Sequence, residues 1–438
     1  MDLQRETTEL LQRLVRFDTV NPPGAERPLQ ELLAGVLAAA GFEVELVGRT
    51  EERPNLVARL RGRADGPTLG LLSHVDTVLA EPAEWSHDPW SGDVADGFVW
   101  GRGTVDMKSQ TAAEVTAAVS LAREGWRPER GELLLLAVVD EETGGGEGAV
   151  WLTESHPDAV RCDYLLNEGA GALLPVDGAR LHGVSVAEKG VLRFTLATSG
   201  RAAHASTPGI GDNALLKMTP LLEAMRDRRA PWEVTEPTRA LLEALEVTMD
   251  GDPGPALAAL RARAPRAADL VEPMLAVTLA PTRIHASEKI NVIPSHAELQ
   301  VDCRIPPGMT PEAALERVRS VLGGDTGAGA GGYELRVDES AIGNASSVES
   351  PLMDAIRDWL AEADAGARVV PTTMTAFTDS RTFRAAFEDC VAYGFFPQRH
   401  QRADETAGLM HAKDERIDVR DLGLATACYR DVTRRLLG

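Results

Sequence analysis

One stretch indicates the fold class: Leu133-Leu-Leu-Leu-Ala-Val-Val-Asp140-Glu141-Glu142-Thr143-Gly144-Gly145-Gly146. An apolar run ends abruptly there in three carboxylates and three glycines. A continuous apolar run bounded by turn residues is typical of a parallel strand that is covered on both faces. Ligands gather at the carboxyl ends of strands in open α/β sheets. We therefore expect the three carboxylates to lie at a functional site.

Two other segments follow the same pattern. The run Thr68-Leu-Gly-Leu-Leu-Ser-His74-Val75-Asp76 ends on a histidine and an aspartate, and Cys162-Asp-Tyr-Leu-Leu-Asn167-Glu168 ends on a glutamate. Three strands that bring imidazole and carboxylate to one edge of a sheet predict a metal site.

Length and charge limit the class of protein. A chain of 438 residues exceeds the size at which one core keeps growing, so two domains are expected. The formal charge of −22 argues against a nucleic-acid-binding surface. Four widely spaced cysteines indicate neither a zinc knuckle nor a disulfide framework, and no run of residues is long and apolar enough for a membrane span. We expect a soluble cytoplasmic protein.

Helical and strand patterns alternate at both ends of the chain, which is typical of an α/β fold. Beyond Lys189 the carboxylate-ended runs stop, and the pattern suits a smaller α+β unit. Within that unit we expect one helix from Asn213 to Asp227, an insertion from Arg229 to Glu272, and a turn from Gly323 to Gly332. The predicted division is a discontinuous catalytic domain, residues 1–190 and 341–438, and an inserted domain, residues 191–340.

Taken singly, the candidate residues have ordinary explanations. A lone histidine after a strand is more often a structural residue than a ligand, but a carboxylate at Asp76 could orient the imidazole of His74. Glu141 and Glu142 could form a solvated strand end, or could supply one metal ligand and one base. Asp106 precedes an alanine-rich segment, so it could cap a helix or face a cation.

The motifs together resemble those of the M20-type metallopeptidases, a family of deacylases, dipeptidases and carboxypeptidases. The matching segments stand in the family's order along nearly the whole chain: His74-Val-Asp76-Thr-Val, Gly101-Arg-Gly-Thr-Val-Asp106-Met-Lys108, Asp140-Glu-Glu142, Asn167-Glu168-Gly169, Gly200-Arg-Ala-Ala-His204, Lys289-Ile-Asn291-Val-Ile-Pro294, Asp302-Cys-Arg304 and His411-Ala-Lys-Asp-Glu415.

The resemblance implies a zinc-peptidase-like catalytic domain with a mostly parallel sheet flanked by helices. It also implies a ligand set for two zinc ions, with a water between them: His74 and Glu168 for one ion, Glu142 and His411 for the other, and Asp106 as the bridge. Glu141 would be the general base. Imidazole and carboxylate ligands also suit Co²⁺ or Mn²⁺.

By the same resemblance, residues 191–340 form a lid through which two subunits dimerise. His204 would reach the partner's active site, whereas an exposed loop histidine is its ordinary reading. Asn291, Arg304 and Arg381 would orient a substrate carboxylate, for which arginine offers two parallel donors. This chain departs from many relatives at His285-Ala-Ser287 and Thr375-Ala-Phe377, where they carry glycines.

The predicted function is hydrolysis of the amide bond of a small N-acyl amino acid or dipeptide with a free carboxylate. Two alternatives remain open at this point: an aminopeptidase with a similar pair of zinc ions, and a relative that has lost catalysis and serves in binding or regulation. The expected partners are a small-molecule substrate and a second copy of the chain, without nucleic acid or membrane.

Overall fold

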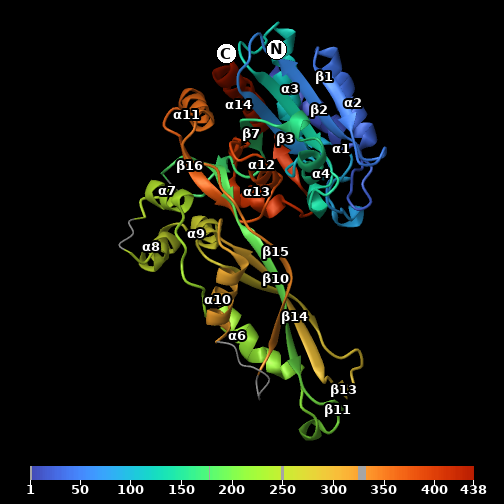
Figure 1. Cartoon of the computed structure of the whole chain (residues 1–438), viewed down its shortest axis with the longest axis vertical. Coiled ribbons are helices and arrows are strands. Elements are labelled where there is room, and N and C mark those ends of the chain that lie inside the picture. Colours follow the sequence, from blue (N-terminus) through green and yellow to red (C-terminus); the bar gives the residue numbers. More distant parts are fainter. Residues whose placement is uncertain (1, 177, 248–250, 324–331) are drawn as a thin grey trace.

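The computed structural model describes residues 2–176, 178–247, 251–323 and 332–438. Figure 1 shows a broad α/β body at one end and a long, narrow extension leading away from it. The expected glycine-rich turn lies outside the described residues, apart from its ends at Gly323 and Gly332. In the described part of the chain, no helix combines the length and the apolarity needed to cross a membrane.

The α/β body is built on one mixed sheet of ten strands among the described residues. Its four neighbouring central strands, β6, β3, β7 and β17, run parallel, as the opening stretch predicted. The path across the sheet is β1 (Glu43–Val47), β2 (Asn55–Arg61), β6 (Glu132–Val138), β3 (Thr68–His74), β7 (Tyr164–Asn167), β17 (Val391–Gly394), β9 (Leu181–Glu188), β8 (Ala172–Leu173) and β18 (Gln398–Arg402), and β16 (Arg368–Met374) pairs with β9.

Helices cover both faces of this sheet, which is why the central strands are apolar throughout. Leu133 and Leu135 of β6 pack in one cluster with residues of five helices, and Leu134 and Leu136 pack in another with residues of three. The five are α1 (Leu3–Val15), α2 (Arg27–Ala39), α3 (Lys108–Arg123), α11 (Pro351–Ala363) and α14 (Val419–Leu437), and the three are α4 (Ala149–Ser155), α5 (Pro157–Val160) and α12 (Ser380–Ala386).

The extension carries a second, antiparallel sheet of four described strands. Two helices, α6 (Thr219–Asp227) and α10 (Pro311–Leu322), contribute to its apolar cluster. The strands are, in order across the sheet, β12 (Thr278–His285), β14 (His296–Ile305), β10 (Gly190–Ser199) and β15 (Glu334–Ala341). The chain passes between the two sheets near Lys189 and again after Ala341, and the domain bounds given above stay a prediction.

One predicted helix is shorter than expected. A 3-10 turn, η4 (Leu215–Met218), precedes α6, so Asn213 and Ala214 lie outside helix. Pro220 stands in the first turn of α6, where its missing N–H has no intrahelical partner to lose. The proline therefore favours the start of a new helix at this point.

The inserted segment packs beside the large sheet. Its helices α7 (Glu236–Ala244), α8 (Gly254–Arg263) and α9 (Pro265–Val271), with the turn η5 (Glu272–Leu275), share an apolar cluster with Leu181 of β9 and Val370 of β16. Lys189 donates to the carbonyls of Pro273 and Ala276 at 2.7 and 2.6 Å, which ties the end of the segment to the crossing between the sheets.

The remaining elements are short. They are η1 (Pro82–Glu84), β4 (Val94–Ala95), β5 (Phe98–Trp100), η2 (Glu141–Thr143), β11 (Ala203–His204), η3 (Pro208–Ile210), β13 (Val292–Ile293), α13 (Ala403–Leu409) and β19 (Arg416–Asp418).

Candidate metal centre

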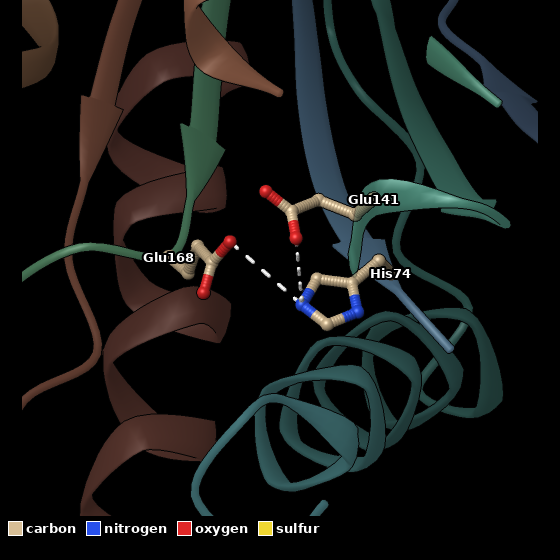
Figure 2. Close-up of side chains that lie close together, drawn as sticks. All are labelled: His74, Glu141 and Glu168. Atoms are coloured by element: carbon tan, nitrogen blue, oxygen red, sulfur yellow. Dashed lines mark ion pairs between the residues drawn. The ribbon is translucent and has the colours of Figure 1, made fainter. Parts of the chain in front are cut away.

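Three neighbouring strand ends meet at one point. His74 is the last residue of β3, while Glu141 follows β6 and Glu168 follows β7, the strands on either side of it. The Nε2 atom of His74 lies 4.0 Å from Glu141 Oε2 and 3.8 Å from Glu168 Oε1, and Figure 2 shows both carboxylates turned toward the imidazole. The parallel order of the strands produces this convergence, because their carboxyl ends share an edge.

Asp106 lies between two imidazoles. Its Oδ1 is 3.0 Å from Nε2 of His74, and its Oδ2 is 3.1 Å from Nε2 of His411. The N-cap position of α3 belongs to Met107, whose side chain makes no capping hydrogen bond. Of the two sequence-based readings of Asp106, the structure therefore favours a carboxylate that faces a cation site.

Glu142 and His411 complete the second half of the cluster. Their Oε2 and Nε2 atoms lie 3.2 Å apart. The other carboxylate oxygen of Glu142 is buried and has no hydrogen-bond partner among the described residues. Burying a carboxylate oxygen without a partner costs free energy. This oxygen could therefore bind a cation.

The cluster holds more negative than positive groups. Burial raises the pKa of Glu141, and the charge of Glu168 raises it further. Burial likewise raises the pKa of Glu168, with Asp106 adding to the shift. Repulsion of this kind is relieved by a cation, and the alternation of imidazole nitrogen and carboxylate oxygen suits zinc, cobalt or manganese.

Both histidines are polarised by neighbouring carboxylates, and they share Asp106. Burial would lower the pKa of His74, but hydrogen bonds to Asp106 and Asp76 raise it well above its usual range. The hydrogen bonds to Asp106 and Glu142 raise the pKa of His411 to about 10 despite partial burial. Metal ligation requires neutral imidazole, so a cation would displace protons from this cluster.

Asp76 supports the cluster differently from the sequence-based expectation. The Nδ1 atom of His74 has the main-chain carbonyl of Asp76 as its partner at 3.0 Å, and the Asp76 carboxylate lies 3.5 Å away. The carboxylate accepts the main-chain N–H groups of Glu141 and Glu142, each at 3.2 Å. Nδ1–H donation to the carbonyl leaves Nε2 free to ligate a metal, while the carboxylate fixes the turn that follows β6.

Asp140 has partners that the sequence did not reveal. Its carboxylate accepts from Arg53 at 3.1 Å, Asn21 at 3.0 Å and Thr143 at 2.6 Å. The backbone of Asp140 is left-handed, with φ of 71°. A non-glycine residue in this region needs support from its surroundings, and these hydrogen bonds supply it just before Glu141.

Glu415 has a structural role that was not predicted from the sequence. The side chain is buried and accepts the N–H groups of Val105 and Asp106 at 2.6 and 3.0 Å, and its second oxygen lies 2.6 Å from Arg102 Nη1. The only sequence signal for this contact was that Arg102 and Glu415 both lie in segments that match motifs of the family. Glu415 therefore shapes the loop that presents Asp106.

Two of the three predicted carboxylate-binding residues lie together. The guanidinium groups of Arg381 on α12 and Arg304 on β14 lie 4.3 and 5.6 Å from the ring centroid of Phe377. Arg304 also forms an ion pair with Asp302 at 2.7 Å. Phe377, one of the departures from the family pattern, thus lies beside both guanidinium groups.

The third of these residues, Asn291, lies with His204 at the far end of the extension. His204 and Asn291 are exposed and adjacent, because β11 pairs with β13 and Ala205 N–H donates to the Asn291 carbonyl at 3.0 Å. Figure 1 shows β11 and β13 at the tip, away from the body that carries the cluster. Within one chain, the structure does not bring His204 or Asn291 to the predicted metal site.

Comparison with known proteins decides the family. Residues 70–435 match the model described as peptidase family M20/M25/M40. The chain belongs to this family. Its fold is accordingly that of an M20 peptidase, and family membership makes it a metal-dependent hydrolase.

Individual relatives are distant. The succinyl-diaminopimelate desuccinylase of Paracoccus denitrificans is 31% identical over 51% of this chain and 56% of that protein, so the match spans about half of that relative. The enzyme of the same name from Cereibacter sphaeroides is 27% identical over 96% of both chains.

Solved structures share the fold over the whole chain. An M20 family metallo-carboxypeptidase of Sulfolobus solfataricus has a TM-score of 0.72 at 17% identity, covering 99% of each chain. A Bacillus subtilis protein described as a dinuclear metal binding peptidase from the M20 family has a TM-score of 0.60 at 15% identity, covering 99% of this chain and 98% of that one.

Proposed function

We propose that this protein uses two divalent cations to hydrolyse the amide bond of a small N-acyl amino acid or dipeptide that carries a free carboxylate. The observation that carries the proposal is the position of Asp106, whose two oxygens face the imidazoles of His74 and His411. A carboxylate placed in this way can bridge two cations. His74 and Glu168 would hold one cation, and Glu142 and His411 the other.

The partnerless oxygen of Glu142 and the excess of carboxylates support the fit of two cations to these residues. When bound, the pair of cations supplies Lewis acidity, which lowers the pKa of water and polarises a carbonyl. Zinc is the proposed metal, and the ligand types equally accommodate cobalt or manganese.

Glu141 would hold and move the proton. Its carboxylate lies beside the cluster, at 4.0 Å from His74 Nε2, and it is additional to the five proposed ligands. It would accept a proton from the attacking water and return it to the leaving amine nitrogen. Asp76 would position Glu141 through the main-chain N–H that it accepts.

The free carboxylate of the substrate would bind at Arg304 and Arg381. Both guanidinium groups lie beside Phe377, which is in the loop between the end of β16 and the start of α12. Two cations at this point favour a substrate carboxylate over a free amine. His204 and Asn291 would act from the extension of a second subunit, since both lie exposed at the tip.

The test compares Glu141→Ala with wild type on N-acetyl amino acids and on unblocked dipeptides, with zinc or cobalt added. We expect the variant to retain two equivalents of metal and to lose at least about 100-fold in kcat, because general acid-base catalysis contributes about 10²–10⁴-fold. Glu154→Ala, an exposed glutamate on α4, is the control. A metal-loaded Glu141→Ala protein with wild-type kcat would refute the role of Glu141 as the general base. Cleavage of substrates with a free amine alone would show that the protein is an aminopeptidase.

A further inference from the structure

A largely apolar cavity opens beside the cluster. Its volume is about 350 Å³, within the range of small-molecule sites. Asp106 and Glu168 stand in its wall, so the cavity is continuous with the proposed metal centre. Most of the remaining wall is hydrocarbon, from Leu174, Leu270, Met274, Phe396 and Met410.

The end of the inserted segment and the turn η5 that follows it form one side of this cavity. Leu270 belongs to α9 and Met274 to η5, and the wall also includes residues of α13. An ion pair between Arg266 and Asp404, at 2.9 Å, joins α9 to α13. Leu270 is only partly buried and belongs to none of the four apolar clusters, so it lines open space instead of filling a core.

Charge recognition is absent from the wall. The described lining residues include no lysine, arginine or histidine, and their only carboxylates are Asp106 and Glu168. The two glutamines of the wall already have partners: Gln110 donates to Glu114 at 2.8 Å, and Gln398 accepts from Thr406 at 2.7 Å. The buried hydroxyl of Thr373 has no partner among the described residues, but it carries no charge. The imidazole of His182 is buried and donates to the carbonyl of Gly171, a wall residue, at 2.7 Å. A second carboxylate of a substrate would lose its hydration here without gaining a counter-charge.

We propose that this cavity holds an uncharged hydrocarbon group on one side of the scissile amide, and that Leu270 and Met274 set the size of that group. The inference rests on the proposed function and narrows its substrate class. The hydrocarbon is either the acyl chain or the side chain of the amino acid, since both flank the amide. A succinyl group, which carries a second carboxylate, does not suit the cavity.

Two series of substrates show whether the acyl chain or the amino-acid side chain occupies the cavity. One varies the acyl group on a single amino acid through acetyl, butanoyl, hexanoyl and succinyl, and the other varies the side chain of N-acetyl amino acids through glycine, leucine, phenylalanine, aspartate and lysine. In the series that fills the cavity, kcat/KM should rise about fourfold per methylene, the value of burying one CH₂ group. Butanoyl and succinyl have the same number of carbons, and we expect butanoyl to exceed succinyl at least tenfold.

Variants then test the wall. Leu270→Lys should lower kcat/KM for the preferred hydrocarbon at least tenfold and narrow the gap to the carboxylate-bearing substrate. Leu270→Ala should move the preference toward a longer group, and it keeps the test valid if the lysine variant does not fold. Ala262→Lys adds the same charge on the exposed surface of α8. It should change neither kcat/KM for the preferred hydrocarbon nor the difference from the carboxylate-bearing substrate.

The outcomes distinguish the two proposals. Succinyl substrates cleaved as well as butanoyl ones, or series in which chain length and side chain have no effect, would overturn the hydrocarbon cavity while leaving amide hydrolysis in place. Unchanged selectivity in both folded Leu270 variants would overturn the role of the inserted segment. Failure to cleave any member of either series, with metal bound, would overturn the proposed function and the cavity's role with it.

Discussion

Arg102 and Glu415 form a buried ion pair, with Nη1 and Oε2 2.6 Å apart. The same carboxylate accepts the main-chain N–H groups that precede and include Asp106. The pair thus connects the C-terminal segment, which carries His411, with the loop that carries Asp106.

Removing Glu415 should therefore weaken metal binding without touching a ligand. We expect Glu415→Ala to reduce stability by about 3–5 kcal/mol, since it leaves a buried guanidinium unpaired, and metal affinity by about 10–100-fold. Urea unfolding and metal titration measure the two effects. Glu388→Ala, at an exposed position, is the matched control. Wild-type values for both quantities in Glu415→Ala would show that the pair does not support the site.

Metal stoichiometry tests the bridging role of Asp106. Wild-type protein should bind two equivalents of zinc, whereas His411→Ala and Glu168→Ala should each retain one. Asp106→Ala should lose both, because its two oxygens face both halves of the cluster. Elemental analysis after dialysis provides the measurement. Two equivalents retained by folded Asp106→Ala would exclude the bridge.

The stability of the metal-free protein should depend on His411 above neutral pH. Hydrogen bonds to Asp106 and Glu142 raise the pKa of His411 to about 10 in the folded state, against about 6.5 when unfolded. The folded state then binds more protons, so this contribution is complete below about pH 6.5 and is lost as the pH rises through about 10.

Thermal unfolding of metal-free wild type and His411→Ala from pH 6.5 to 10 isolates this contribution. We expect the wild-type midpoint to fall more steeply with pH than that of the variant, and the difference to shrink in high salt because His411 is half exposed. Parallel slopes for the two proteins would contradict the assignment. Metal-loaded wild type should not show the excess slope, because its imidazole is already neutral.

The chain pattern predicted the central part of the site for a clear physical reason. Apolar runs ending at His74, Asp140 and Glu168 are parallel strands covered on both faces, and such strands present their carboxyl ends at one edge. Local pattern alone left Asp106 undecided between a helix cap and a cation-facing carboxylate. His411 was assigned by resemblance, because nothing in its own segment indicates a ligand.

The sequence by itself thus determined the α/β class, the three strand ends and the family to which the chain belongs. Tertiary structure alone decided the partners of Asp140, the ion pair beneath Asp106 and the use of the Asp76 carbonyl, since each depends on side chains brought together from distant segments. It also decided that α9 of the inserted segment forms a wall of the cavity beside the cluster. Packing of helices against a sheet edge creates such a wall, and no local periodicity encodes which edge a helix will cover.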